Sequence, residues 1–207
     1  MKVAVVDYGL GNLGSVRRAL AELGADPLLA SSPDELRAAD RVILPGVGAF
    51  ADGMRLLRAG GWADELRGLS ARGKPILGIC LGMQLLASRG SEGGETKGLD
   101  LIAGDVVALS DLGCTLRVPH VGWNEVAVRD GASRILDGIP GGTDFYFVHS
   151  YAFTPRDPAH ILATTAYGAC VPAVVGSGHV AGTQFHPEKS SKAGFKVLRN
   201  FLSAGAC

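Results

Sequence analysis

Short apolar runs alternate with amphipathic stretches through the first half of the chain. The apolar runs predict strands over 3–6, 27–30, 41–44 and 75–79. Between them, apolar residues recur at helical spacing and predict helices over 12–23, 51–57, 62–71 and 81–88. This alternation is typical of βαβ units, which build a parallel sheet.

The second half is richer in strand-like segments. We expect strands over 106–109, 119–128, 144–151, 161–165, 173–176 and 179–185, a short helical stretch near Ser133 and a last helix over 191–202. The whole pattern predicts an α/β fold, an open, doubly wound, mostly parallel sheet with additional antiparallel strands. No long polar linker interrupts it, so residues 1–207 are expected to form a single domain.

The segment Gly78-Ile79-Cys80-Leu81-Gly82 lies where a predicted strand ends and a predicted helix begins. It has the form of a nucleophile elbow, a sharp turn with room only for glycine on either side of the nucleophile. A sulfur at a helix N-terminus is favoured as thiolate. A lone cysteine after an apolar strand is more often a small core residue, so the catalytic interpretation needs a second observation.

That observation is the segment 184–188, Gln-Phe-His-Pro-Glu, which follows the last predicted strand. Residues two apart in extended chain point the same way, and proline stiffens the backbone between His186 and Glu188. The carboxylate can therefore orient the imidazole, and the imidazole can take the thiol proton of Cys80. Cys80, His186 and Glu188 form the predicted catalytic triad; the alternative for His186 alone is a structural histidine.

A glycine-containing loop, 45–50, follows the third predicted strand. In open α/β sheets the functional crevice lies beyond the carboxyl ends of the strands. We therefore expect the backbone amides near Val47, Gly48 and Leu81 to stabilise the oxyanion that forms when Cys80 attacks a carbonyl group. Taken alone, this loop would be an ordinary glycine turn.

The charge and cysteine content narrow the classes of function. Lys plus Arg and Asp plus Glu number 20 each, so nothing draws the chain to nucleic acid or anionic membrane. The apolar run at 1–7 is too short for a signal peptide, and no stretch is long enough to span a bilayer. The cysteines lack Cys-x-x-Cys spacing, which argues against a zinc site or a disulfide framework. We expect a cytoplasmic protein without a metal.

Two glycine patterns resemble cofactor loops without fitting them. The pattern at 9–14 matches Gly-x-Gly-x-x-Gly, but no acidic residue ends the second predicted strand. The pattern at 68–74 has the spacing of a phosphate loop, but Pro75 replaces the magnesium-binding hydroxyl and the segment ends a helix. We therefore expect no nucleotide cofactor.

The motifs at 78–84 and 185–188 resemble those of the class I glutamine amidotransferases. Within that class, the segments at 45–50, 119–124, 146–151 and 186–190 are similar to the glutaminase subunits of imidazole glycerol phosphate synthases. The resemblance covers essentially the whole chain and implies the flavodoxin-like fold of the class. It also implies that Cys80 attacks the side-chain amide of L-glutamine, that His186 passes a proton to the leaving ammonia, and that Glu188 orients His186.

The resemblance further implies substrate contacts at Gly46, Gln84, Glu92, Ser150 and Tyr151. Glu92 would hold the α-amino group of glutamine, and Gly46 with the backbone at 150–151 would hold the main-chain end. From the residues alone, Gln84 is equally a polar residue on a helix flank, and Glu92 a solvated loop carboxylate.

A partner is implied as well, a cyclase subunit with a (β/α)8 barrel. It would use the ammonia to convert a phosphoribulosyl-formimino aminoimidazole carboxamide ribotide into imidazole glycerol phosphate and aminoimidazole carboxamide ribotide, in histidine biosynthesis. The glutaminase would be weak until the partner's ligand activates it. Asn12, Trp123, Tyr146 and Lys189 occupy the positions that would face the partner, although Trp123 is equally a core residue and Lys189 a solvated charge.

Three rival interpretations remain open at this point. Another amidotransferase of the class would share the elbow but lack Pro-Gly-Val-Gly. A cysteine hydrolase or chaperone with the same elbow would lack the His-Pro-Glu segment. A catalytically silent scaffold for the partner should have lost Cys80, His186 or Glu188, and all three are present.

Overall fold

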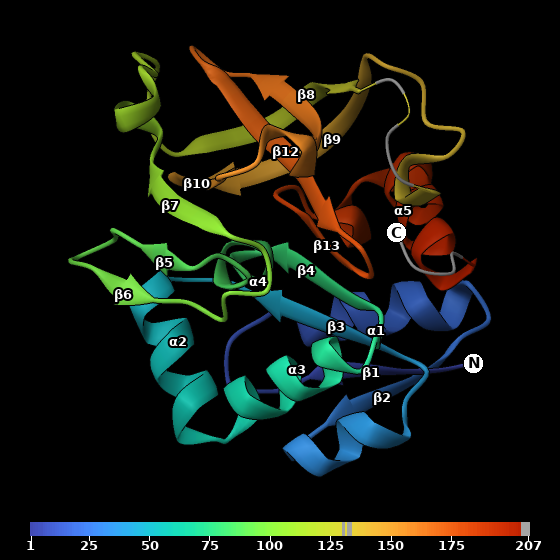
Figure 1. Ribbon diagram of the computed structural model, residues 1–207. Helices are drawn as coiled ribbons and strands as arrows, with labels where there is room; N and C mark the ends of the chain where they lie inside the picture. The colour runs from blue at the N-terminus through green and yellow to red at the C-terminus, as the bar shows by residue number, and fades with distance from the viewer. Residues whose placement is uncertain (130, 132–133, 204–207) are drawn as a thin grey trace.

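A large mixed sheet runs through the protein (Figure 1). The computed structural model describes residues 1–129, 131 and 134–203. One half of the sheet is parallel, and its strands in order are β2 (Asp26–Ala30), β1 (Lys2–Val6), β3 (Arg41–Gly46), β4 (Ile76–Cys80) and β13 (Val180–Thr183). The antiparallel half continues with β12 (Cys170–Ser177), β11 (Ile161–Ala166), β8 (His120–Val128) and β9 (Thr143–His149).

Helices cover both faces of the parallel half. The helices are α1 (Leu13–Glu22), α2 (Phe50–Ala59), α3 (Trp62–Ala71), α4 (Leu81–Leu85) and α5 (Ser191–Ser203). Alternate residues of β1 enter separate cores, since Val6 packs with α2 and α3 whereas Val5 packs with α1 and α5. Because both faces are buried, these strands read as continuous apolar runs in the sequence.

A smaller sheet flanks the carboxyl end of β4. Its strands in order are β10 (Tyr151–Pro155), β7 (Gly104–Ala108), β5 (Arg89–Gly90) and β6 (Thr96–Lys97). Short 3-10 turns complete the described chain: η1 (Pro33–Ala38), η2 (Leu109–Leu112), η3 (Arg134–Leu136), η4 (Pro158–His160) and η5 (Pro187–Lys189). None of the described helices is both long enough and apolar enough to cross a membrane.

The predicted α/β class is confirmed, and several predicted elements differ in extent. The strand expected over 173–176 begins at Cys170, and the strand expected over 179–185 ends at Thr183. The helix expected over 81–88 ends at Leu85, because the N–H groups of Leu86 and Ala87 donate three residues back and that of Ser88 donates to the Gly104 carbonyl. The strand expected over 144–151 breaks at Ser150, where the chain leaves β8 and pairs with β7. The short strands β5 and β6 were not predicted. The helical stretch expected near Ser133 lies outside the described residues at that position, and η3 follows it.

Candidate active site

The turn at Cys80 joins β4 directly to α4. Cys80 has φ 54° and ψ −112°, a left-handed conformation that is costly for any residue other than glycine. A Cβ at Gly78 would lie 2.5 Å from the Gly82 carbonyl oxygen, and one at Gly82 would collide with the Leu44 carbonyl oxygen. The two glycines thus allow the close packing that holds the cysteine in its strained turn.

His186 and Glu188 form a buried pair beside this turn. The Nδ1 atom of His186 lies 2.9 Å from a Glu188 carboxylate oxygen, and the two side chains are 2% and 1% exposed. The backbone N–H of His186 donates to the Tyr146 carbonyl at 3.0 Å, which fixes the start of η5 against β9. With Nδ1–H donated to Glu188, the Nε2 atom is the one available for proton exchange.

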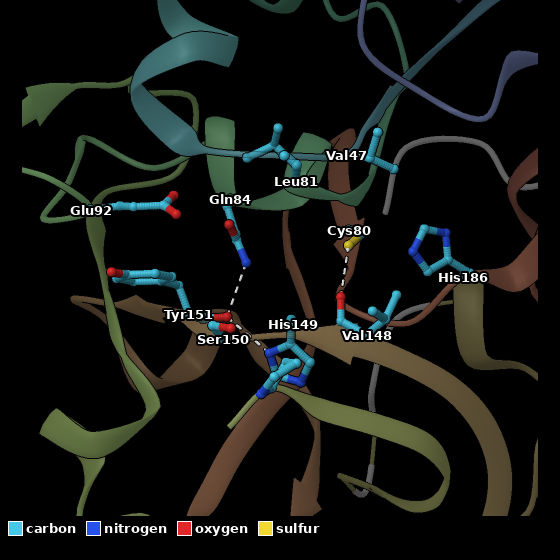
Figure 2. A pocket seen from close by; sticks show the side chains of 12 residues that line it. Val47, Cys80, Leu81, Gln84, Glu92, Val148, His149, Ser150, Tyr151 and His186 are labelled. Carbon is cyan, nitrogen blue, oxygen red and sulfur yellow. Dashed lines mark hydrogen bonds between the residues drawn. The ribbon is translucent and has the colours of Figure 1, made fainter. Parts of the chain in front are cut away.

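Cys80 and His186 line the same cavity (Figure 2). The Cys80 thiol lies 3.7 Å from the Val148 carbonyl oxygen, and the side-chain amide of Gln184 donates to the sulfur at 3.8 Å. The Nε2 atom of His186 has no hydrogen-bond partner among the described residues. Because both side chains line one cavity, this ring nitrogen is the candidate acceptor for the thiol proton.

The environment of His186 favours its protonated form. Burial lowers the pKa of the ring, but the Cys80 sulfur and the Glu188 carboxylate outweigh burial and raise the pKa from 6.5 to about 9. The ring can therefore hold the proton taken from Cys80 at neutral pH and deliver it to a leaving group.

This pKa predicts a pH limit for the glutamine hydrolysis that the sequence motifs imply. Because the folded-state pKa is raised, the imidazolium persists above pH 6.5 and is lost as the pH rises through about 9. We expect kcat/KM for glutamine hydrolysis to fall over that range, and Glu188→Gln to move the fall to lower pH in addition to reducing the rate. If kcat/KM fell over the same pH range in the variant, Glu188 would not be the group that raises the pKa of His186.

The cavity is about 330 Å³ and collects most of the predicted site residues. Its lining includes Cys80, His186, Val47, Gly48, Leu81, Gln84, Glu92, Ser150 and Tyr151. Glu188 lies behind His186, away from the cavity. Gly46 is buried in β3, where an added Cβ would meet the Tyr8 hydroxyl at 2.6 Å.

The two predicted substrate-binding side chains are both engaged with the protein. Glu92 accepts the N–H of Phe50 at 2.7 Å through one carboxylate oxygen, at the first residue of α2. Its position at the cavity is therefore fixed by a helix N-terminus, where a carboxylate is favoured. The Nε2 atom of Gln84 donates to the Tyr151 carbonyl and to Oε1 of Gln184, each at 3.0 Å.

The carbonyl group of Tyr151 is not free to bind a substrate. Its carbonyl accepts hydrogen bonds from Gln84 at 3.0 Å and from Nδ1 of His149 at 2.9 Å, as Figure 2 shows. A carbonyl oxygen has two lone pairs, and both are used here. Any contact from this residue to a substrate must come from its N–H or its side chain.

Gln184 and the Val148 carbonyl contact the sulfur, and we did not predict either contact from the sequence. Gln184 is fully buried and holds the Cys80 sulfur through its amide. The sequence signal was its place two residues before His186, but a glutamine within a buried strand segment has no characteristic spacing. Val148 contributes only backbone, which carries no residue-type signal.

Three of the predicted interface residues lie together on the surface. Trp123 is 54% exposed, and its ring centroid lies 6.1 Å from that of Tyr146. The Lys189 ammonium lies 5.9 Å from the centre of the Tyr146 ring. Asn12 immediately precedes α1, which packs against the turn that carries Lys189. Trp123 is thus a surface residue rather than a core residue.

Comparison with known proteins agrees with this geometry. The model of the family "Glutamine amidotransferase class-I" matches residues 4–204. The chain belongs to the class I glutamine amidotransferase family. The imidazole glycerol phosphate synthase subunit HisH of Moorella thermoacetica is 50% identical over 96% of this chain and 93% of that protein. The HisH subunit of Halobacterium salinarum is 49% identical over 97% of this chain and 92% of that protein.

Solved structures agree on the fold of this amidotransferase. A crystal structure of a glutamine amidotransferase superposes with a TM-score of 0.75 at 23% identity, covering 96% of each chain. A chain of the PurLQS structure from Thermotoga maritima gives the same TM-score of 0.75 at 22% identity, covering 97% of each chain. The family match confirms that the chain is a class I glutamine amidotransferase, as its motifs predicted. The HisH relatives confirm the predicted resemblance to glutaminase subunits.

Proposed function

We propose that this amidotransferase hydrolyses L-glutamine with the triad Cys80, His186 and Glu188 and passes the ammonia to a cyclase subunit of imidazole glycerol phosphate synthase. The observation that carries the proposal is one cavity holding an elbow cysteine and a carboxylate-oriented histidine. The HisH relatives, about half identical over nearly the whole chain, direct this chemistry to histidine biosynthesis.

The proposed reaction begins when the Cys80 thiolate attacks the amide carbon of glutamine. The oxyanion that develops is stabilised by backbone amides at Val47, Gly48 and Leu81. The carbon–nitrogen bond then breaks as His186 gives its proton to the amide nitrogen, which leaves as ammonia, and a glutamyl thioester remains on the sulfur. Water hydrolyses the thioester, which releases glutamate and regenerates the thiol.

The substrate roles follow from the cavity lining. Gln84 and Glu92 hold glutamine beside the sulfur, and Glu92 has a second carboxylate oxygen for the α-ammonium group. The N–H groups near Ser150 and Tyr151 hold the main-chain end, and the contact proposed for Gly46, which is outside the lining, rests on the family motif alone. We also propose that residues 1–207 form one glutaminase domain. We place it in the cytoplasm, because an unpaired catalytic thiol fits a reducing compartment.

The proposed partner is a cyclase subunit with a (β/α)8 barrel, bound as a heterodimer. Ammonia released into bulk water would be protonated and lost, so direct transfer to an acceptor site favours a docked partner. The surface formed by Trp123, Tyr146, Lys189 and the chain near Asn12 is the proposed docking face. Trp123 is 54% exposed, which leaves a large aromatic side chain for the partner to bury.

Truncation of Trp123 should separate docking from folding. Trp123→Ala removes an exposed ring, so we expect little change in the thermal midpoint but about 10- to 100-fold weaker cyclase binding. Lys189→Ala should weaken binding or coupling in the same direction with a smaller effect. The matched control is Trp62→Ala, which empties a core site at 4% exposure and should lower the midpoint instead. Unchanged binding and coupling in both surface variants would remove this face from the proposal.

Glutamate release tests the proposed function. It should be measured for the chain alone, with the cyclase, and with the cyclase plus its nucleotide ligand. We expect slow release alone and a large increase when both are present. No release under any condition, with ammonium-dependent cyclase activity still enhanced, would identify a silent scaffold instead.

A further inference from the structure

Two buried histidines that the proposed mechanism does not use lie at the glutamine cavity, where His149 is part of the lining and His120 stands behind it. His120 in β8 and His149 in β9 are paired across the two strands, and they are 2% and 6% exposed. Nδ1 of His120 lies 3.0 Å from Nε2 of His149. The ring of His120 also stacks on Phe147 and Tyr167, with centroids 4.8 and 3.9 Å away. Such tight packing allows neither ring to turn freely.

The cavity end of this pair determines where the ring protons lie. The Tyr151 carbonyl can only accept a hydrogen bond, so Nδ1 of His149 carries the hydrogen of the 2.9 Å contact. In a neutral ring Nε2 is then an acceptor, and Nδ1 of His120 must donate to it. Both rings are therefore Nδ1–H tautomers.

The opposite end requires the same assignment independently. The Asn124 side chain accepts the Glu125 N–H through Oδ1 at 2.9 Å and donates to the Ala166 carbonyl through Nδ2 at 3.0 Å. Its Nδ2 group is thus the one that faces Nε2 of His120, at 3.3 Å, and that nitrogen must accept. The hydrogen-bond directions derived from the two ends agree.

A charge on either ring would break this arrangement. A protonated His120 would place its Nε2–H against the N–H of Asn124. A protonated His149 would place its Nε2–H against Nδ1–H of His120, unless His120 moved its proton to the Asn124 side and met the same conflict there. Burial lowers the pKa of each ring to about 4, and for His149 the neighbouring His120 and His186 oppose a positive charge as well. Both rings are neutral at physiological pH.

The hydrogen bonds continue from the histidines to the nucleophile. The Tyr151 carbonyl also accepts from Gln84, the second Gln84 N–H goes to Oε1 of Gln184, and Gln184 donates to the sulfur. Each group in the series has one orientation that suits both of its neighbours. The orientation of the Gln84 amide at the cavity therefore depends on His120 in β8, which acts through His149 and the Tyr151 carbonyl.

We propose that His120 and His149 are positioning residues of the glutaminase, which hold the Tyr151 carbonyl and so keep the Gln84 amide in one orientation toward glutamine. The inference rests on the proposed function, since it assigns the residues to the same cavity. Without the His149 donor, the carbonyl is free to shift and the Gln84 amide can flip. Because Gln84 holds glutamine in the ground state and the transition state alike, its loss of order raises KM more than it lowers kcat.

Two substitutions of His149 distinguish a donor at Nδ1 from simple space filling. Asparagine places an amide nitrogen near the position of Nδ1, and glutamine places it near Nε2. In the complex with the cyclase, we expect H149Q to raise KM for glutamine about tenfold with kcat within about threefold, and H149N to retain most of the wild-type KM. Equal KM values in the two variants, or a wild-type KM in H149Q, would overturn the proposal.

The matched control is Tyr167→Phe. It keeps the ring stacked on His120 but removes the hydroxyl that donates to the Arg117 carbonyl at 2.6 Å, so KM should stay at the wild-type value. Cyclase activity with added ammonium should be unchanged in H149Q and H149N, because neither variant alters the acceptor site. A loss of that activity would place the effect in the docking surface and count against the positioning role.

A spectroscopic measurement tests the inference without glutaminase activity. Nitrogen NMR of the imidazole rings in the isolated chain should show both His120 and His149 with a protonated Nδ1 and an unprotonated Nε2 near pH 7. An Nε2–H tautomer or an imidazolium at either residue would overturn the assignment. This readout needs no turnover, so its failure is distinguishable from a failure of the proposed glutamine hydrolysis.

Discussion

Replacing Cys80 with alanine should abolish glutamine-dependent formation of imidazole glycerol phosphate and leave the reaction with added ammonium intact. The sulfur is the proposed nucleophile at the cavity, and its loss removes the covalent route altogether. Removal of a nucleophile of this kind typically costs on the order of 10⁴-fold or more in rate. The two activities should be measured side by side on the complex with the cyclase.

Cys114→Ala is the matched control for that experiment. Cys114 is buried in a small separate cluster with Leu109, Ala152 and Val171, and it does not line the cavity. Both activities should survive this substitution. If Cys80→Ala removed the ammonium-dependent activity as well, Cys80 would be needed for the fold or for docking rather than for chemistry.

Gly82→Ala should cause the largest loss of stability among single-methyl additions near the site. The new Cβ would collide with the Leu44 carbonyl oxygen, which belongs to the backbone of β3 and cannot swing aside. Strand β3 and helix α4 would have to separate at the centre of the sheet. We expect the free energy of unfolding to fall by about 3 kcal/mol or more, measured by chemical denaturation.

Gly14→Ala gives the matched control for backbone effects. Gly14 is an exposed residue of α1, and a Cβ there would meet nothing within 4 Å. Alanine in a helix is favoured over glycine, so this variant should be more stable by up to about 1 kcal/mol. Wild-type stability in Gly82→Ala would contradict the close packing described for the elbow.

The elbow and the triad could be predicted from the sequence because their signals are local. Glycines two residues before and after Cys80 mark a turn that excludes side chains, and the structure contains the collisions that they avoid. His186 and Glu188 are separated by one residue, so their contact depends on short-range geometry. The strands of the parallel half were predicted for a similar reason, since burial on both faces gives uninterrupted apolar runs.

Contacts that depend on strand pairing could not be predicted in this way. His120 and His149 are 29 residues apart and meet only because β8 and β9 pair in a particular register. The same register sets the break at Ser150, which neither glycine nor proline marks. From the sequence, Glu92 is indistinguishable from a solvated loop carboxylate. Its contact with the N–H of Phe50, the first residue of α2, exists only in the folded chain.

Exposure of the aromatic residues shows a further limit. Trp62 and Trp123 both lie in stretches that mix apolar and polar residues, yet they are 4% and 54% exposed. Trp62 begins a helix that packs on the sheet, whereas Trp123 lies on an outward-facing position of β8. Which face of an antiparallel strand is buried depends on the elements that pack against it. A face covered by a partner chain has the same apolar pattern in the sequence as a face covered by the protein's own core.

Covalent labelling with an electrophilic diazoketone analogue of glutamine tests the central claim most directly. The labelled chain, in complex with the cyclase, should be digested and the modified residue located by mass spectrometry. We predict one adduct, on the peptide that contains Cys80, with labelling suppressed by excess glutamine. Labelling at Cys114 or Cys170, or no adduct at Cys80 in a complex that still turns over glutamine, would contradict the account.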